Sequence, residues 1–239
     1  MFVDKTLQVD LSIAATADQN VVVITGPDSV TATQITVEYN GPNANQPSTY
    51  GNVLYIWQSG DMIPWSTEAL HSDALEGNSP SGTQSFGGLD VTDDSYIIGY
   101  AVGPLNNTTG AWSKYSNVIA SAFVPKSGSS DYQMTKSTVD VAKRGSTSLV
   151  AKIEMLPGYN PAGSNTWVGI WEGVAASYNQ KPKWRAVATS GNASSTVSFN
   201  KILLTRGTTY TLGLFASGYS DQDAQLKQTT LAATHTFTV

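Results

Sequence analysis

The sequence predicts an all-β protein built from two tandem β-sandwiches, and two observations indicate this fold class. Apolar and polar residues alternate with a period of two in several short segments, and no segment shows a sustained helical period. Motifs also recur at a single spacing, since Tyr96 and Tyr210 lie 114 positions apart (210 − 96). Other pairs at this spacing are Gly99 with Gly213, residues 56–57 with 170–171, and Phe123 with Phe237. An internal repeat of this kind predicts two copies of one fold.

The chain has 239 residues, enough for two domains that each bury their own core. We expect the first sandwich in residues 1–125 and the second in residues 126–239. The segment Pro125 to Asp131 is short and polar, which predicts a linker that holds the two domains as neighbours with a restricted hinge.

An extra strand is expected at the start of the first domain. Residues 6–14 alternate between apolar and polar side chains, which is typical of a half-buried strand, and the second copy has no clear counterpart. This strand is interpreted as an edge strand of the first domain. The alternative is that it crosses to the second domain or to another subunit.

The remaining strands are expected in the same order in both copies. Each copy has an alternating strand, a loop rich in Gly, Pro and Asn, a strand that is apolar on both sides, and a closing apolar strand. In the first copy these are residues 35–39, 40–47, 52–57 and 118–124. In the second copy they are residues 150–155, 157–163, 166–171 and 235–239.

The second copy contains a corner that resembles the turn between the fifth and sixth strands of fibronectin type III and related immunoglobulin-like sandwiches. In that family a leucine ends one strand, a glycine sits in the turn, and a tyrosine opens the next strand. Here these residues are Leu203, Gly207 and Tyr210, and the first copy matches with Leu89 and Tyr96. The resemblance implies that each tyrosine hydroxyl bonds to backbone a few residues upstream. It implies a fold and specifies no function.

Composition excludes several classes of protein. The net charge is −5, the pI is near 4.9, and the basic residues are scattered, so nucleic acid is not expected as a partner. The chain has no cysteine, which excludes thiol catalysis and disulfides. No apolar stretch is long enough for a transmembrane helix, and the N-terminus lacks the apolar core of a signal peptide. We therefore expect either cytoplasmic synthesis or secretion with the leader already removed.

Catalytic signatures are lacking, and the sequence predicts a protein that is not an enzyme and needs no cofactor. The two histidines, His71 and His235, are not accompanied by a nucleophile elbow, and no phosphate-binding or dinucleotide fingerprint is present. A glycoside hydrolase needs only two carboxylates that meet in space, so a glycan hydrolase is kept as the third hypothesis.

Two tryptophans on strands are candidates for a ligand platform. If Tyr96 faces the core, Gly99 faces outward, and the neighbouring third strand places Trp57 beside it. The same parity places Trp171 beside Gly213. A flat indole next to a bare glycine forms a surface that suits the apolar face of a sugar ring. The alternatives are that both tryptophans are core residues, or that another domain or subunit covers them.

Aromatic residues in loops are the next candidates for ligand contacts, because binding residues often lie on loops of a rigid sandwich. Trp112 and Tyr219 occupy comparable loops between the last two strands of each copy. Nearby Asp221 and Asp223 are expected to bond sugar hydroxyls. Carboxylates of this kind also suit calcium, but Asp-rich turns are usually only turns, and no metal is predicted. The other loop aromatics are Trp65, Tyr159, Tyr178 and Trp184.

Together these features predict a non-catalytic binding protein whose favoured ligand is a carbohydrate. The alternative is a protein-interaction or adhesion module, including a toxin-associated one, that uses the same aromatics as an interface. A second copy of this chain is a further candidate partner.

Overall fold

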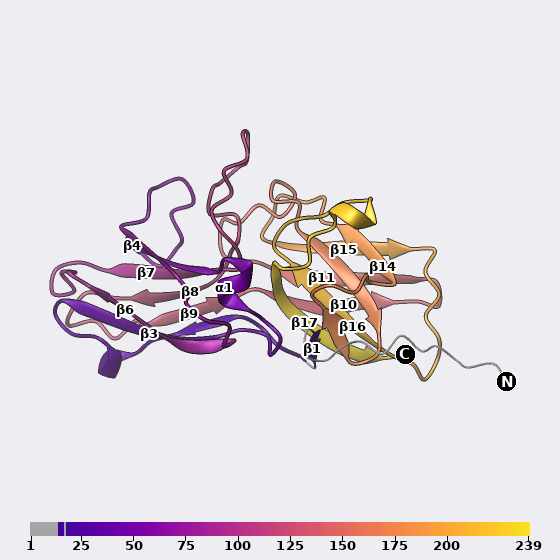
Figure 1. Ribbon diagram of the computed structural model, residues 1–239, viewed down its shortest axis with the longest axis horizontal. Helices are drawn as coiled ribbons and strands as arrows, with labels where there is room; N and C mark the ends of the chain where they lie inside the picture. The colour runs from indigo at the N-terminus through magenta and orange to yellow at the C-terminus, as the bar shows by residue number, and fades with distance from the viewer. Residues whose placement is uncertain (1–13, 17) are drawn as a thin grey trace.

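The computed structural model describes residues 14–16 and 18–239 and consists of two antiparallel β-sandwiches placed end to end along the long axis (Figure 1). The all-β prediction is confirmed, and so is the prediction of two sandwiches with the architecture of immunoglobulin-like and fibronectin type III domains. Only three short helical turns interrupt the strands of the described residues. They are η2 (Pro27–Ser29), α1 (Pro47–Tyr50) and η3 (Asp223–Gln225).

The first sandwich packs a three-stranded sheet against a five-stranded sheet. The smaller sheet has the order β2 (Val22–Ile24), β3 (Gln34–Asn40) and β6 (Ser81–Gly87). The larger sheet has the order β5 (His71–Ala74), β4 (Val53–Gln58), β7 (Tyr96–Ala101), β8 (Val118–Val124) and β9 (Gln133–Lys136). The buried residues of β3 alternate along the strand, as expected for a sheet with one face on the core and one in solvent.

The second sandwich repeats this plan. Its three-stranded sheet has the order β10 (Thr138–Arg144), β11 (Ser148–Glu154) and β15 (Ser194–Asn200). Its four-stranded sheet has the order β14 (Trp184–Val187), β12 (Trp167–Glu172), β16 (Thr209–Phe215) and β17 (Leu231–Thr238). A separate two-stranded sheet joins β1 (Ala14–Thr16) to β13 (Ala175–Ser177).

Strand pairing in the two sandwiches follows the same register. Val53 of β4 lies opposite Ala101 of β7, and Trp167 of β12 lies opposite Phe215 of β16. The third and sixth strands are therefore neighbours in each sandwich, as predicted. In both sandwiches the sixth strand also pairs with the strand that follows it, β7 with β8 and β16 with β17. The register of this pairing shifts just before the sixth strand ends.

Both tyrosine corners are confirmed. The hydroxyl of Tyr96 accepts a hydrogen bond from the backbone N–H of Asp90 at 2.9 Å, and that of Tyr210 accepts one from Thr205 at 3.0 Å. The leucine assigned to the second corner is wrong by one residue. Leu204 is buried there, whereas Leu203 is 67% exposed. The two adjacent leucines are indistinguishable by composition, and only the direction of each side chain separates them.

The predicted linker is instead a hairpin loop within the first sandwich. Residues 125–131 connect β8 to β9, and these strands pair so that Phe123 lies opposite Gln133. The chain passes between sandwiches at Ser137, the single residue between β9 and β10. Ser137 is fully buried, and both its backbone N–H and its hydroxyl donate to the carbonyl oxygen of Ile119. A one-residue connection with these bonds leaves little freedom for a hinge.

The start of the described chain lies against the second sandwich. Most of the predicted N-terminal strand, residues 6–13, falls outside the described residues. The strand β1 pairs with β13, and the following residues run along the free edge of β17, where Asn20 lies opposite Ala233. The carboxylate of Asp18 accepts a bond from the backbone N–H of Thr236 at 2.5 Å. The described part of the chain thus starts on the second sandwich before it enters the first at β2.

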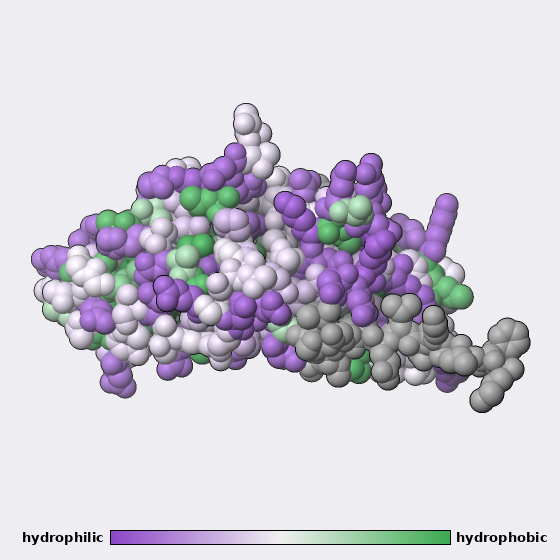
Figure 2. Space-filling view, in the orientation of Figure 1, coloured by the Kyte–Doolittle hydropathy of each residue, from purple (hydrophilic) through white to green (hydrophobic). Residues whose placement is uncertain are grey.

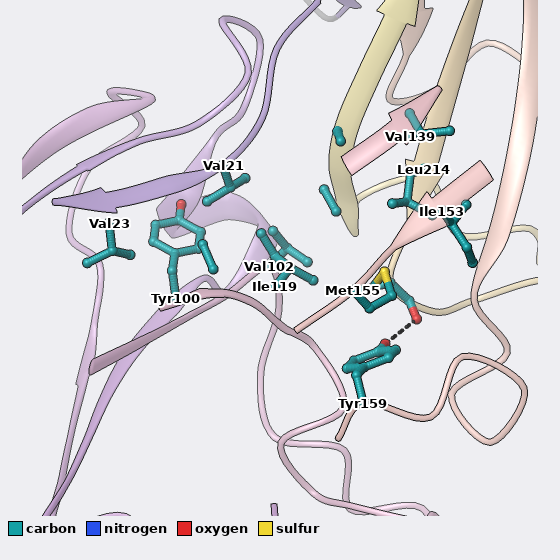
Figure 3. Packing of buried hydrophobic residues seen from close by; sticks show 14 of the residues in the cluster. Val21, Val23, Tyr100, Val102, Ile119, Val139, Ile153, Met155, Tyr159 and Leu214 are labelled. Atoms are coloured by element: carbon teal, nitrogen blue, oxygen red, sulfur yellow. Dashed lines mark hydrogen bonds between the residues drawn. The ribbon is translucent and has the colours of Figure 1, made fainter. Parts of the chain in front are cut away.

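One hydrophobic cluster runs through both sandwiches without a break. Figure 3 shows the region where the two cores meet, with Val102 and Ile119 from the first sandwich and Met155 and Tyr159 from the second. No helix in the described part of the chain is both long enough and apolar enough to cross a bilayer.

Candidate functional site

Trp57 and Trp171 lie beside the outward-facing glycines, as the parity argument predicts. A β-carbon built on Gly99 would lie 3.1 Å from the Trp57 ring, and one on Gly213 would lie 3.0 Å from the Trp171 ring. The open platform expected there is nevertheless wrong, because the two side chains are only 1% and 3% exposed. They offer a ligand almost no surface.

The chain's own loops cover both tryptophans. Ile63 and Tyr115 pack on Trp57, and the Trp57 indole N–H donates to the Thr67 carbonyl at 3.1 Å. The Trp171 indole N–H donates in the same way to the Gln180 carbonyl at 2.9 Å. These rings form small clusters on the outer sheet faces, separate from the central core.

Two other predicted residues, Trp65 and Trp112, meet Tyr159 at the junction between the sandwiches. The ring centroids of these three residues, which we call the junction cluster, lie 5.2 to 5.5 Å apart. Both tryptophans come from the first sandwich, and Tyr159 comes from the second. Edge-on packing of this kind contributes beyond the area that it buries.

Each tryptophan of the junction cluster lies over a glycine of the second sandwich. The Trp65 indole N–H donates to the Pro157 carbonyl at 2.9 Å, and a β-carbon on Gly158 would lie 2.9 Å from that nitrogen. Trp112 lies equally close to Gly163, and its indole N–H donates to Ser164 Oγ at 2.6 Å. Here an indole packed on a glycine forms a contact between the two sandwiches of one chain.

The hydroxyl of Tyr159 connects the two sandwiches at the base of this cluster. Its oxygen lies 2.6 Å from the carbonyl oxygen of Ser116 in the first sandwich and 2.9 Å from that of Ala216 in the second. Figure 3 marks one hydrogen bond of this hydroxyl with a dashed line. With one proton, it donates to one carbonyl at a time. Burial raises the pKa of Tyr159 to about 12, so the hydroxyl remains a donor throughout the physiological range.

A groove of about 640 Å³ lies beside the junction cluster, between the loops that follow the sixth strand of each sandwich. We call it the junction groove. In Figure 1 the loop between β7 and β8 projects from the top of the molecule, and in Figure 2 the tip of this projection is pale, neither strongly hydrophilic nor hydrophobic. Residues 102–108 form one wall, and residues 217–220, 225, 227, 229 and 230 form the other. The sequence comparison of Trp112 with Tyr219 treats these loops as paired sites, but here they contribute to one groove.

Two half-buried tyrosines line the groove. Tyr50 comes from α1 of the first sandwich and stacks on Tyr178 of the second, with ring centroids 5.2 Å apart and planes inclined by 20°. Tyr219, on the opposite loop, donates its hydroxyl proton to Asp221 Oδ1 at 2.6 Å. This bond to a carboxylate is the main cause of the raised pKa of Tyr219. Both rings pack against the same outer cluster around Phe215.

The predicted carboxylates hold this loop in place. Asp223 accepts from Lys181 Nζ at 2.8 Å and from Arg185 at 2.6 Å, and the bond from Lys181 is the main cause of its lowered pKa. The guanidinium of Arg185 also donates to the Asp221 carbonyl oxygen at 2.6 Å. Asp221 and Asp223 therefore position Tyr219 instead of lining the groove themselves.

Amide side chains in the groove fall into two sets. Asn106 and Asn117 are engaged within the protein. Asn106 donates to Ser116 Oγ at 3.0 Å, and Asn117 joins the walls, because it accepts from Ser217 Oγ at 2.7 Å and donates to the Pro104 carbonyl at 3.1 Å. Three others are exposed and available to a ligand: Asn107, Asn165 and Gln225. Of these, Asn165 has a φ of 54°, an uncommon backbone conformation that asparagine tolerates.

The remaining predicted aromatics lie elsewhere. Trp184 is half-buried on the second sandwich, with Lys183 Nζ 4.8 Å above its ring, and it does not line the groove. Tyr178 is 5% exposed and supports Tyr50 from behind. Sequence analysis missed Tyr50 itself, although it closely follows a loop rich in Gly, Pro and Asn. It also missed Lys227, for which no local pattern gives a signal.

A buried polar network lies under Tyr50. Asn45 and Asn52 both donate to the Tyr100 hydroxyl, at 3.0 and 2.8 Å. The nearby Tyr178 hydroxyl has no hydrogen-bond partner among the described residues, and burial raises its pKa well above the usual value. Burying an unpaired hydroxyl costs free energy in the folded state.

Tyr178→Phe is therefore expected to raise the free energy of unfolding by about 1 kcal/mol, because it removes the unpaired group and keeps the ring. Tyr100→Phe, the matched change, removes a paired hydroxyl and should lower the free energy by about 1 kcal/mol. Urea denaturation of both variants checks this. A loss of stability in Tyr178→Phe would contradict the assignment of its hydroxyl as unpaired.

The groove offers no pair of carboxylates. Its lining contains no Asp or Glu, and the described residues contain no group of three His, Asp or Glu side chains placed to hold a metal ion. His235 lies away from the groove, 3.2 Å from the carboxylates of both Asp18 and Asp140. The arrangement in the groove suits binding through rings, amides and hydroxyls.

Comparisons with known proteins add little. No protein-family model matches the sequence, and no curated protein matches it significantly. Among solved structures, a crystal structure of chicken CNTN1 FN1–FN3 domains is similar with a TM-score of 0.25 and 8% sequence identity. The similarity covers 94% of this chain and 66% of that chain.

Proposed function

We propose that this protein binds carbohydrate in the junction groove and does not act as a catalyst. The observation that carries the proposal is the pairing of two half-buried tyrosines, Tyr50 and Tyr219, with a lining of amides and hydroxyls. Sugars present an apolar ring face and a rim of hydroxyls, so they match a site with both kinds of surface.

The support behind the two rings favours recognition by a preformed site. Tyr50 is held by its stacking on Tyr178, and Tyr219 by its bond to Asp221. Rings that are already fixed lose little conformational freedom when a ligand binds, which improves affinity. Exposed amides such as Asn107 and Gln225 can donate to and accept from sugar hydroxyls.

The alternative is a protein interface built from the loop and sheet-face aromatics. Trp65 and Trp112 already pack within the chain at the junction cluster, and Trp57 and Trp171 are buried. A protein partner would have to use other residues. The groove is also a concave site of about 640 Å³ in which polar residues dominate the lining, which favours a small hydroxylated ligand.

Tyr219→Ala is expected to weaken binding of the sugar found on a glycan array by about thirtyfold, the effect of losing about 2 kcal/mol from one central aromatic contact. Tyr219→Phe retains the ring and should bind within a fewfold of the unmodified protein. Isothermal titration calorimetry measures both, and circular dichroism confirms that each variant is folded.

Trp184→Ala serves as the matched control, because it removes a half-buried aromatic outside the groove. If Trp184→Ala abolished binding and Tyr219→Ala did not, the site would lie near the edge strand β14 and not in the junction groove. An array on which no glycan binds would overturn the proposal.

A further inference from the structure

Lys227 is the single charged side chain among the described residues that line the junction groove. The nearest acidic residues in the same loop are Asp221 and Asp223, and both are engaged. Asp221 accepts from Tyr219, and Asp223 is held between Lys181 and Arg185. Within the described chain no carboxylate forms an ion pair with Lys227, whose positive charge is therefore not locally neutralised.

The backbone of the loop fixes the base of this lysine. The backbone N–H of Lys227 donates to the Gly218 carbonyl at 3.0 Å. Gly218 has a φ of 91°, and a β-carbon on it would lie 2.5 Å from Lys227 Cβ. Only glycine permits this approach, which places the lysine stem on the same wall as Tyr219.

The charge of this wall differs in sign from that of the whole protein. The chain carries 18 acidic and 13 basic residues, so its overall field repels anions. In the groove the balance is one positive charge and no negative charge. A ligand with an acidic group that enters the groove therefore meets a positive charge and no negative one, and the amide of Asn165 is a further donor in the same lining.

We propose that the groove selects an acidic sugar, a saccharide bearing a carboxylate or a sulfate, with Lys227 as the residue that recognises the anionic group. This inference rests on the proposed carbohydrate-binding function and specifies the class of its ligand. Tyr50 and Tyr219 contact the sugar rings, and the lysine ammonium sets the preference for acidic over neutral forms.

The test is an array on which each glycan is present in an acidic form and in a matched neutral form, either carboxyl-reduced or desulfated. We expect the full chain to bind acidic members about fivefold more tightly, the effect of one exposed ion pair. Because salt screens such a pair, this preference should shrink at 1 M sodium chloride, while binding to neutral members changes little. Comparing the glycans that carry a carboxylate with those that carry a sulfate shows which of the two anionic groups the groove prefers.

Lys227→Met should bind both members of each pair equally, and Lys227→Arg should retain the preference. Lys126→Met removes one positive charge from the exposed hairpin between β8 and β9, outside the groove, and should leave the preference unchanged. Equal binding of acidic and neutral members by the unmodified chain would overturn this inference alone. A preference that survives in Lys227→Met would do the same. If no glycan of either kind binds, the proposed function fails together with it.

Discussion

Replacing Tyr159 by alanine is expected to lower the free energy of unfolding by about 3–5 kcal/mol, the range for removing a large buried aromatic side chain. Its ring is 1% exposed and packs edge-on against Trp65 and Trp112. Its hydroxyl also connects carbonyl groups of the two sandwiches. Urea denaturation followed by tryptophan fluorescence measures the loss and shows whether the two sandwiches still unfold together.

The conservative change Tyr159→Phe separates packing from hydrogen bonding. It keeps the ring and should cost about 1 kcal/mol, the net contribution of one hydrogen bond. Equal losses for the two variants would mean that the hydroxyl, not the ring, joins the sandwiches. No loss in either variant would contradict the junction described here.

Gly169→Ala is expected to lower the free energy of unfolding by about 3 kcal/mol through overpacking. A β-carbon at this position would lie 2.6 Å from Trp171 Cη2 and 3.0 Å from Trp167 Cζ3. Both rings are buried, and each donates its indole N–H to a backbone carbonyl. Neither can move aside without breaking that bond. Thermal unfolding monitored by circular dichroism measures the effect.

Gly87→Ala is the matched control on strand β6. Nothing lies within 4 Å of the added β-carbon, and its φ lies outside the left-handed range. The change should leave stability unaltered or raise it by about 0.5 kcal/mol, because alanine restricts the unfolded chain. If Gly87→Ala were as damaging as Gly169→Ala, intrinsic strand effects would explain both, and the contact with Trp171 would not.

Local patterns were sufficient to predict several of the strands, such as those at residues 35–39, 52–57 and 118–124, as well as the two tyrosine corners and the placement of Trp57 beside Gly99. Each depends on residues close in sequence or on the parity of a strand, which has a fixed period of two. Local patterns did not predict other strands, such as β5 and β9. They were not sufficient for the hairpin at residues 125–131, because a short polar segment suits a hairpin and a linker equally well. That choice depends on β9 pairing with β8, a contact that no local pattern encodes.

The candidate site could not be predicted for the same reason, because it also depends on contacts between residues that are distant in the sequence. The outward direction of Trp57 follows from parity, but its burial depends on how the loop with Ile63 folds back over it. The groove joins Tyr50 of one sandwich to Tyr219 and Lys227 of the other. Its composition therefore depends on how the two sandwiches sit against each other, which the buried connection at Ser137 and the junction cluster hold in place together.

The position of residues 14–16 and 18–20 against the second sandwich has a consequence for synthesis on the ribosome. Gln19 and Thr234 bond to each other although they are 215 positions apart in the sequence. Contacts this distant form slowly, because a long loop must close first. While translation proceeds, the early segment has no partner, since β13 and β17 have not yet been made. The first sandwich can complete its sheets alone. In the second sandwich, the edge of β16 is covered only when β17, the last strand, has been made. Until then that exposed edge of the nascent chain is open to pairing with another molecule.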